Sequence, residues 1–406
     1  MSLLSVFNSV SITLSWDRVD FALWTLDVEP VMFLKVLIAP DKFKGTLTAQ
    51  AAAQAIARGW RQARPEDELH RVPITDGGDG FGAVMSGLLE ARAMKCKTVD
   101  AAHRFCRATW WWNAKAKIAV IESANIIGLA KLPPGKFHPF HLDTLGLGKV
   151  IQAAHARGAK KILIGIGGSA TNDGGFGLAR ALGWKFLNIE NREIGEWTQL
   201  AQIHKIEPPH PQTSTDIIVA VDVQNQLLGP HGATRVYGPQ KGLRPPDFRL
   251  AESCLKKLTQ FVRGAGQAAL VPGTGAAGGL GFGLLMFAGA KLKPGFDLFA
   301  QYADLDARLP AADIVITGEG AIDRSTFMGK GVGEIARRSR KLKIPCIALG
   351  GTVEARLSAK GFLRSFALSD LTSVRKAKLY PALWLARLAA KAAREMLSPK
   401  GLHRPL

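Results

Sequence analysis

The sequence predicts an α/β protein that is long enough for two domains. At 406 residues the chain exceeds what one small hydrophobic core requires. Short apolar runs lead into polar glycine loops and then into helical patterns, and this succession recurs as it does in parallel α/β folds. Two further strand patterns, at residues 106–112 and 117–122, are separated by four residues. That spacing predicts a hairpin, so at least one sheet is expected to be mixed.

The individual elements are predicted from apolar periodicity and from capping residues. Strand patterns lie at residues 33–39, 69–74, 106–112, 117–122, 162–164, 216–221, 313–317 and 345–349. Helical patterns lie at residues 48–59, 81–90, 146–157, 249–262 and 381–397, and one more closes at Gly183. Thr48 is a suitable N-cap for the first of these helices. The 43 glycines fit a fold with many strand-to-helix turns.

Residues 1–31 differ from the rest of the chain. They lack the basic start and the continuous apolar core of a secretory signal, and Asp17, Asp20 and Asp27 argue against a transit peptide. We expect the folded protein to begin near Met32, with the preceding segment an appendage or an over-extended start.

Composition narrows the class of protein. Hydrophobic residues at 47% and charged residues at 21% are ordinary for a globular protein. The four cysteines, Cys96, Cys106, Cys254 and Cys346, have no metal-ligand spacing and are too few for a disulfide scaffold. A reducing, cytoplasmic setting is therefore expected.

The net charge of +20 favours anionic partners. Because the basic residues are scattered and no known nucleic-acid module is present, we expect phosphorylated small molecules and no nucleic acid. Residues 264–290 carry no charge, but they contain nine glycines, and their continuous apolar part at 283–290 is far shorter than the ~20 residues of a membrane span. No membrane partner is expected.

The glycine loop between the strand at 162–164 and the helix that closes at Gly183 is the central feature of the chain. Glycines at a helix N-terminus let backbone N–H groups approach a phosphate closely. The letters Gly165-x-Gly167-x-x-Ala170, with Glu190 about 20 residues on, also satisfy the dinucleotide fingerprint. A plain tight turn is the third interpretation.

Polar side chains follow almost every predicted strand. They are Asp41 and Lys44, Asp76 and Asp79, Asn172 and Asp173, Asp222 and Asn225, and Glu319, Asp323 and Lys330. Each alone is more often a cap or a turn residue, but strand ends of an open α/β sheet converge on one crevice. Phosphoryl transfer needs such lysines, amides and carboxylates. The chain contains neither a GxxxxGK[ST] loop, nor the protein-kinase motifs, nor a GxSxG elbow.

Seven ordered motifs resemble bacterial glycerate kinases of the glyoxylate and sugar-acid pathways, over residues 32–397. The motifs are IAPDKFKGTLTA (38–49), PITDGGDG (73–80), IGGSATNDGG (166–175), VDVQNQLLGPHGA (221–233), YGPQKG (237–242), GTGAAGGLGFG (273–283) and ITGEGAIDRSTFMGK (316–330). The resemblance implies ATP- and Mg²⁺-dependent phosphorylation of D-glycerate, most often at the 2-hydroxyl, giving 2-phosphoglycerate. It also implies a flavodoxin-like domain made from residues 32–75 and 290–397, and a mixed-sheet domain, residues 76–289, inserted into it.

The resemblance and the chemistry together assign candidate roles, with the site in the cleft between the domains. Catalytic candidates are Asp41, Lys44, Asp76 and Asp173. Substrate- or phosphate-binding candidates are Gly167, Gly168, Ser169, Asn172, Asn225, Asp323 and Lys330. Asp222 and Glu319 are the candidate metal ligands. Lys44 suits a carboxylate or the transferring phosphoryl group, and an aspartate can accept the hydroxyl proton.

The chain departs from the family pattern at a few positions. Asp79 stands where Glu is usual, Gln224 and Gln226 replace a common Thr and Pro, and Ala321 and Ser325 replace a frequent Arg and Gln. Two alternatives stay open: the dinucleotide fingerprint allows a nicotinamide-dependent oxidoreductase of a small hydroxy acid, and the altered residues 321 and 325 allow a non-catalytic ligand-binding or regulatory relative. The sequence also leaves open whether the protein is a homo-oligomer.

Overall fold

Two β-sheets organise the computed structural model, which describes residues 33–209, 215–262, 264–327, 331–354 and 361–396. Residues from Leu34 onward group as one compact unit. The expected appendage at residues 1–31 and the candidate Lys330 lie outside the described residues. No described helix is long and apolar enough to cross a membrane.

The first sheet is parallel throughout and has the order β13-β12-β11-β1-β2. Its strands are β1 (Lys35–Pro40), β2 (Glu68–Arg71), β11 (Ile314–Ile322), β12 (Cys346–Val353) and β13 (Arg364–Ala367). Read from β2, this is the 2-1-3-4-5 order of flavodoxin-like folds. The prediction of a flavodoxin-like sheet built from both ends of the chain is therefore confirmed.

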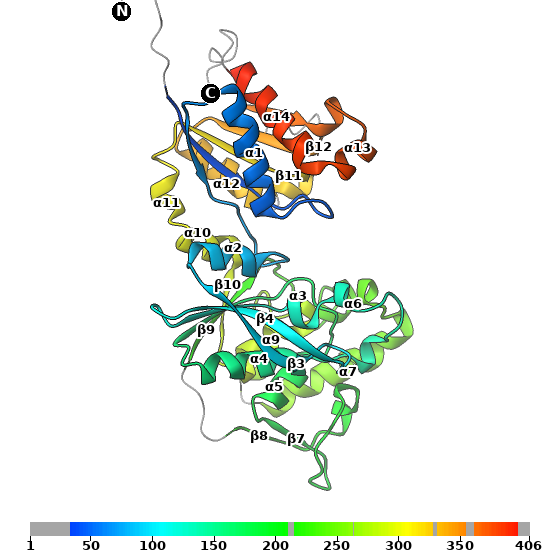
Figure 1. The fold of residues 1–406 in the computed structure, drawn as a ribbon. Coiled ribbons are helices and arrows are strands. Elements are labelled where there is room, and N and C mark those ends of the chain that lie inside the picture. The colour runs from blue at the N-terminus through cyan, green and yellow to red at the C-terminus, as the bar shows by residue number, and fades with distance from the viewer. Residues whose placement is uncertain (1–32, 210–214, 263, 328–330, 355–360, 397–406) are drawn as a thin grey trace, which may run out of the picture. The chain divides into compact units, whose positions relative to one another are not determined.

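Helices cover both faces of the parallel sheet (Figure 1). One face carries α1 (Ala49–Ala63) and α14 (Pro381–Met396), and the other carries α10 (Gly295–Tyr302), α11 (Leu305–Arg308) and α12 (Gly331–Lys341). Thr48 caps α1 as predicted, because its Oγ1 accepts a hydrogen bond from the N–H of Ala51. A Cβ on Gly59 would lie 1.9 Å from the Ala386 carbonyl oxygen, so only glycine lets α1 approach α14 this closely.

The second sheet is mixed and has the order β10-β9-β6-β5-β4-β3. Its strands are β3 (Arg92–Val99), β4 (Phe105–Asn113), β5 (Ile118–Glu122), β6 (Lys161–Gly165), β9 (Asp216–Val221) and β10 (Lys291–Pro294). The β3–β4 and β4–β5 pairs are antiparallel and the others parallel. The predicted hairpin is confirmed, but the sequence prediction missed the edge strands β3 and β10.

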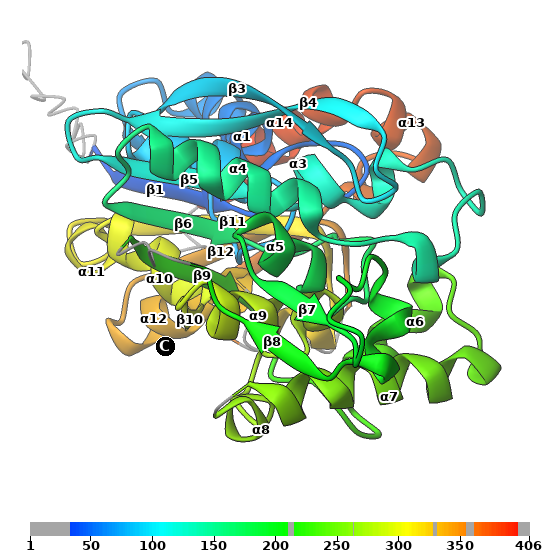
Figure 2. The ribbon, with the colours of Figure 1, turned by 90° about the horizontal axis from the view of Figure 1, so that it is seen from below.

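The mixed sheet is also covered on both faces (Figure 2). Helices α4 (Leu145–Ala156), α5 (Phe176–Ala181) and α9 (Ala276–Phe287) share a core with one face, and α2 (Phe81–Leu88) packs against the other. That second core also contains Leu37 and Val315 of the parallel sheet together with Val120 and Leu163 of the mixed sheet. The two sheets therefore share one hydrophobic core.

The remaining elements are short or lie at the periphery. They are α3 (Ala124–Ile127), β7 (Lys185–Leu187), β8 (Lys205–Glu207), α6 (Ala233–Lys241), α7 (Pro245–Phe261), α8 (Ala265–Ala268), α13 (Val374–Leu379) and the 3-10 turns η1 (Leu129–Lys131), η2 (Pro139–His141), η3 (Trp197–Gln202), η4 (Arg324–Phe327) and η5 (Leu368–Asp370). Helix α9 begins with a kink, where Ala277, Gly278 and Gly279 have positive φ. A Cβ on Gly278 would lie 1.9 Å from the Thr171 carbonyl oxygen, so this kink brings the second glycine segment against the first.

Candidate active site

The loop after β1 lies against the carboxyl-terminal part of β11 at the carboxyl edge of the parallel sheet. The N–H of Asp41 donates to the Gly318 carbonyl oxygen at 2.8 Å. A Cβ on Gly320 would lie 3.4 Å from the Lys44 backbone nitrogen. The fold thus brings Asp41 and Lys44 next to the segment that carries Glu319, although more than 270 residues separate them in the chain.

Lys42 joins this edge to the loop at residues 76–80. Its Nζ lies 3.9 Å from Asp76 Oδ1 and donates to the Asp79 carbonyl oxygen at 3.1 Å. Burial lowers the pKa of Lys42, but the carboxylates of Asp76, Asp41, Asp79 and Glu122 outweigh that effect and raise the pKa above its usual range. Lys42 is therefore a fixed positive charge among carboxylates, and the sequence analysis did not identify it.

The loop at residues 76–80 also packs on the glycine loop after β6. A Cβ on Gly167 would lie 2.6 Å from Gly78 Cα, and one on Gly168 would lie within 2.4 Å of Asp79 Oδ1. Glycine at both positions is therefore explained by the close approach of two loops. The contact joins the polar edge of the parallel sheet to that of the mixed sheet.

Glu122 holds the loop at residues 76–80 in place from the carboxyl end of β5. It ends β5, is 5% exposed, and accepts hydrogen bonds from Gly80 N to Oε1 (3.0 Å) and from Gly82 N to Oε2 (2.8 Å). Burial raises the pKa of this carboxyl group. The sequence analysis treated Glu122 only as the last residue of a strand, since nothing local indicates that its partners lie 40 residues earlier.

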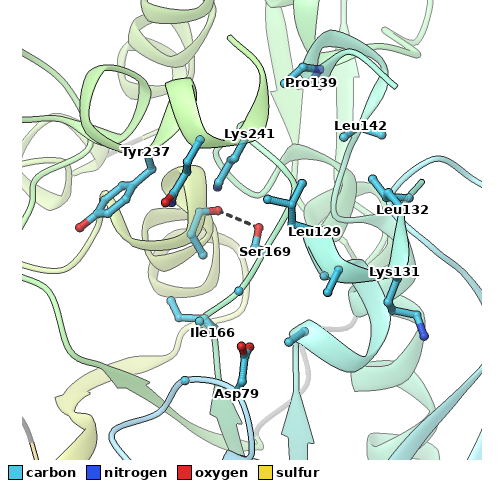
Figure 3. A pocket seen from close by; sticks show the side chains of 18 of the residues that line it. Asp79, Leu129, Lys131, Leu132, Pro139, Leu142, Ile166, Ser169, Tyr237 and Lys241 are labelled. Carbon is cyan, nitrogen blue, oxygen red and sulfur yellow. Dashed lines mark hydrogen bonds between the residues drawn. The ribbon is translucent and has the colours of Figure 1, made fainter. Parts of the chain in front are cut away.

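A cavity of about 1540 Å³ opens above the two loops. In Figure 3 Leu129, Leu132, Leu142 and Pro139 form one side, Tyr237 and Lys241 lie on the other, and Ser169 and Asp79 lie between them. The predicted site residues that line this large cavity are Asp76, Gly167, Gly168, Ser169 and Asp222. It therefore combines an apolar wall with polar glycine loops.

A smaller cavity of about 340 Å³ lies on the other side of the loop at residues 76–80. The predicted residues Asp41 and Lys44 line it together with Lys42, Thr46 and Thr48. Asp79 lines both cavities. The structure thus places a lysine-bearing pocket next to a larger cleft, with one aspartate common to the two.

Two of the predicted residues lie in the interior beneath the glycine loop. Asp173 is fully buried, and its carboxylate accepts hydrogen bonds from Thr144 N (3.0 Å), Thr144 Oγ1 (2.7 Å), Gly175 N (3.3 Å) and Gly177 N (3.0 Å). Burial raises the pKa of Asp173 to about 6. Asn172 is also fully buried and donates to Thr234 Oγ1 at 3.0 Å. Neither side chain lines a cavity described above, so their predicted roles stay predictions.

The other predicted residues support loops. Asn225 accepts a hydrogen bond from Tyr237 Oη at 2.6 Å and donates to the His231 carbonyl oxygen at 2.7 Å. Glu319 Oε1 accepts from Thr326 Oγ1 at 2.7 Å, and Asp323 Oδ1 accepts from the N–H of Ser325 at 2.7 Å. None of these three lines the two cavities.

Comparison with known proteins identifies the family. The model of the glycerate kinase family matches residues 36–397. The glycerate kinase of Halalkalibacterium halodurans is 37% identical over 326 residues, which cover 78% of this chain and 85% of that protein. The chain belongs to the glycerate kinase family. It is accordingly an enzyme, a kinase.

Two further relatives support the assignment to the glycerate kinase family, one by its sequence and one by its structure. The glycerate 2-kinase of Escherichia coli (strain K12) is 35% identical over 329 residues, which cover 79% of this chain and 86% of that protein. A crystal structure described as a glycerate kinase 2 from Salmonella typhimurium LT2 has a TM-score of 0.79 at 30% identity, covering 91% of this chain and 100% of that one.

The described part of the chain does not form a closed magnesium site from protein side chains alone. Among the described residues, no group of three or more His, Cys, Asp or Glu side chains is placed to hold a metal ion. Kinases often hold Mg²⁺ with one or two carboxylates plus substrate phosphates, so the donors need not form a closed cage. Asp222, Asp76 and Asp79 line the large cavity and fit that arrangement.

The dinucleotide interpretation of the glycine loop lacks its structural context. In that fingerprint the glycines open directly into a helix, whereas α5 begins only at Phe176, six residues beyond Ala170. Glu190, the candidate ribose ligand, lies in an exposed turn and pairs with Arg192 at 3.3 Å. The geometry therefore does not favour a nicotinamide-dependent oxidoreductase.

Proposed function

We propose that this glycerate kinase transfers the terminal phosphoryl group of ATP, with Mg²⁺, to the 2-hydroxyl of D-glycerate and so forms 2-phosphoglycerate. The observation that carries the proposal is the pair of adjoining cavities that share Asp79: a large cleft of nucleotide size and a small pocket with lysines. The relative from Escherichia coli, which is named a glycerate 2-kinase, supports the choice of hydroxyl.

The small pocket is the proposed acceptor site. Lys44, which is exposed there, and Lys42 supply positive charge for the carboxylate of a three-carbon acid. The proton of the attacking hydroxyl needs an acceptor, and Asp41 and Asp76 are the candidate bases. Lys42 Nζ lies 3.9 Å from Asp76 Oδ1, which links the two candidate groups of this pocket.

The large cavity is the proposed donor site. The apolar side chains of Leu129, Leu132 and Leu142 suit a purine base, and the glycine loops suit the phosphates. When bound, Mg²⁺ neutralises charge that develops on the transferring phosphoryl group. We propose Asp222 and Asp79 as its protein ligands, whereas Glu319, a metal candidate from the sequence, lines neither cavity.

Asp173 has a different proposed role. Because its carboxylate is buried and accepts four hydrogen bonds from the starts of α4 and α5, it would act by holding the glycine loop rather than by touching substrate. Asn172, bonded to Thr234 of α6, would act in the same way.

The proposed domain division follows the two sheets except at β10 (Lys291–Pro294), which pairs with β9 of the mixed sheet although it lies within residues 290–397. Strands β1, β2 and β11–β13 form the parallel sheet and β3–β6, β9 and β10 the mixed one. Apart from β10, this supports a flavodoxin-like domain of residues 32–75 and 290–397 with residues 76–289 inserted, and we propose that the site lies between the two.

An ADP-release assay with ATP, D-glycerate and Mg²⁺ tests the function. We expect ADP release that depends on both glycerate and Mg²⁺, and a product that enolase consumes without a mutase. Release that is independent of glycerate, or a product that enolase consumes only after a mutase is added, would contradict the proposal.

A further inference from the structure

Lys241 is a buried lysine at the end of α6, in the wall of the large cavity. Its side chain is 6% exposed, and Nζ donates to the Thr171 carbonyl oxygen at 2.6 Å. Figure 3 shows the side chain extending from α6 toward Ser169, opposite the apolar wall. The sequence analysis did not identify this lysine, although it lies in one of the family motifs.

The positive charge of Lys241 has no carboxylate bonded to it in the part of the chain that the structure describes. The charged side chain that acts on it is Asp173, whose own oxygens are occupied by Thr144, Gly175 and Gly177. Burying an ammonium group with only a carbonyl partner is unfavourable. A ligand that brings an anionic oxygen into the cavity would supply the missing partner.

We propose that Lys241 binds a phosphate oxygen of the nucleotide in the large cavity. The inference rests on the proposed function, since it assumes that the nucleotide occupies this cavity. Phosphate is favoured over the carboxylate of the acid because Lys42 and Lys44 already line the small pocket. A Lys ammonium has three donors, and the bond to Thr171 uses one of them.

Binding is coupled to protonation of this lysine. Burial lowers the pKa of Lys241 to about 7, although Asp173 acts in the opposite direction. Without ligand, a substantial fraction of the side chain is therefore neutral at pH 8, and a bound anion favours its charged form. Nucleotide binding at pH 8 should take up a proton from the buffer.

Other titratable and charged groups face this end of the cavity. Burial raises the pKa of Tyr237 on α6, away from neutral pH. His138 and Arg244 line the cavity as well, and His138 Nε2 lies 3.3 Å from Asp247 Oδ2 of α7. Asp173, whose pKa burial raises to about 6, also acts on Lys241, and measuring at pH 8 keeps it ionised. H138Q is the control for an imidazole as the site that takes up the proton.

The first experiment measures ADP affinity by calorimetry in the full chain and in Lys241→Met. We expect binding to weaken about 10- to 100-fold, as for a lost charge-assisted hydrogen bond. Lys149→Met removes the same charge from an exposed position on α4 outside the cavity, and should change affinity less than about threefold. Adenosine, which lacks phosphate, should bind equally to wild type and Lys241→Met.

The second experiment has its main readout in the wild-type protein, so that readout does not depend on whether a variant folds. ADP binding to the wild-type protein is measured at pH 8 in two buffers of different ionisation enthalpy. We expect proton uptake in wild type and H138Q, and none in Lys241→Met. The ligand-free melting temperature of Lys241→Met should be no lower than that of wild type, because methionine removes a buried charge while filling similar space.

Several results would overturn the proposal. ADP affinity that is unchanged in Lys241→Met, equal losses of ADP and adenosine affinity, or proton uptake that persists without Lys241 would each contradict it. So would a raised KM for glycerate with ADP affinity intact. If wild type binds ADP with this signature but does not phosphorylate glycerate, the proposed function fails while the assignment of Lys241 stands.

Discussion

Replacing Glu122 with glutamine tests how the loop common to both cavities is held in place. The carboxylate accepts the N–H groups of Gly80 and Gly82 with its two oxygens, at 3.0 and 2.8 Å. Glutamine has one acceptor oxygen and one NH₂ group, so one of the two backbone donors would face another donor. The substitution keeps the size of the side chain and removes one bond of the pair.

The magnitude follows from these contacts. A buried N–H left unpaired costs about 1–3 kcal/mol, and burial already disfavours the charged form of Glu122, which offsets part of the loss. At about 2.1 cal/mol/K of unfolding entropy per residue, 1 kcal/mol changes the Tm of a chain of this length by about 1 °C, so we expect a fall of about 1–3 °C. Displacing Asp76 and Asp79 by about 1 Å should lower kcat by on the order of 10²-fold.

Asp100→Asn is the matched control. Asp100 is a buried carboxylate, 4% exposed, and it lines neither cavity. Its Oδ1 accepts the N–H groups of Ala102 and Arg104 at 2.9 and 3.0 Å, and its Oδ2 accepts Arg104 Nε at 2.7 Å, so asparagine removes one charge-assisted bond of a buried carboxylate. Asp100→Asn should lower Tm by an amount similar to that for Glu122→Gln and leave kcat within about twofold of wild type. Steady-state kinetics and thermal melts of both variants test whether Glu122 positions the loop. If Glu122→Gln lowers Tm but leaves kcat as high as the control does, the positioning role is refuted.

Three further predictions concern the acceptor pocket, the buried carboxylate and the kink in α9. Lys44→Ala and Lys42→Met should each lower kcat/KM by about 10²-fold or more with little change in Tm, and normal kinetics in either would remove that lysine from the site. Burial raises the pKa of Asp173 from its usual 3.8 to about 6, so ionisation of this carboxyl group opposes folding. The free energy of unfolding of wild type should therefore fall by up to about 3 kcal/mol as pH rises from about 4 to 6. Urea unfolding of wild type and Asp173→Asn across that range checks this, and parallel curves for the two would contradict it. Gly278 has φ +73° and lies against Thr171, so Gly278→Ala should lower the free energy of unfolding by about 3 kcal/mol or more. An unchanged urea midpoint would show that the glycine at this kink is not required.

The sequence predicted the fold well where strands are buried on both sides. Strands β1, β6 and β9 are nearly continuous apolar runs, and each was expected close to its observed position. Strand β11 was expected at residues 313–317, but it continues through glycine and polar residues to Ile322. The edge strands β3 and β10 were missed because they alternate exposed Lys or Arg with partly buried residues, and their strand state depends on one neighbour. The local apolar pattern therefore identified the inner strands of each sheet, whereas the edge strands depend on hydrogen bonding to a neighbouring strand.

The sequence also predicted part of the candidate site. Asp41, Lys44, Asp76, Ser169 and Asp222 were named from the polar loops after strands, and all line one of the two cavities. This follows because parallel strands place their carboxyl ends at a common edge. The cavity-lining role of these residues was accessible from local sequence, while their catalytic roles stay predictions.

What the sequence by itself determined is the α/β class and the family resemblance, which implied a flavodoxin-like domain, because apolar period, turn chemistry and ordered motifs are local properties of the chain. Only the tertiary structure separated Asp173, which is buried, from Asp79, which lies between two cavities, since burial depends on what other segments cover a loop. It alone identified Lys42, Glu122 and Lys241, whose partners are distant in sequence. A lysine at a helix end resembles any other in sequence, and only packing and desolvation distinguish it.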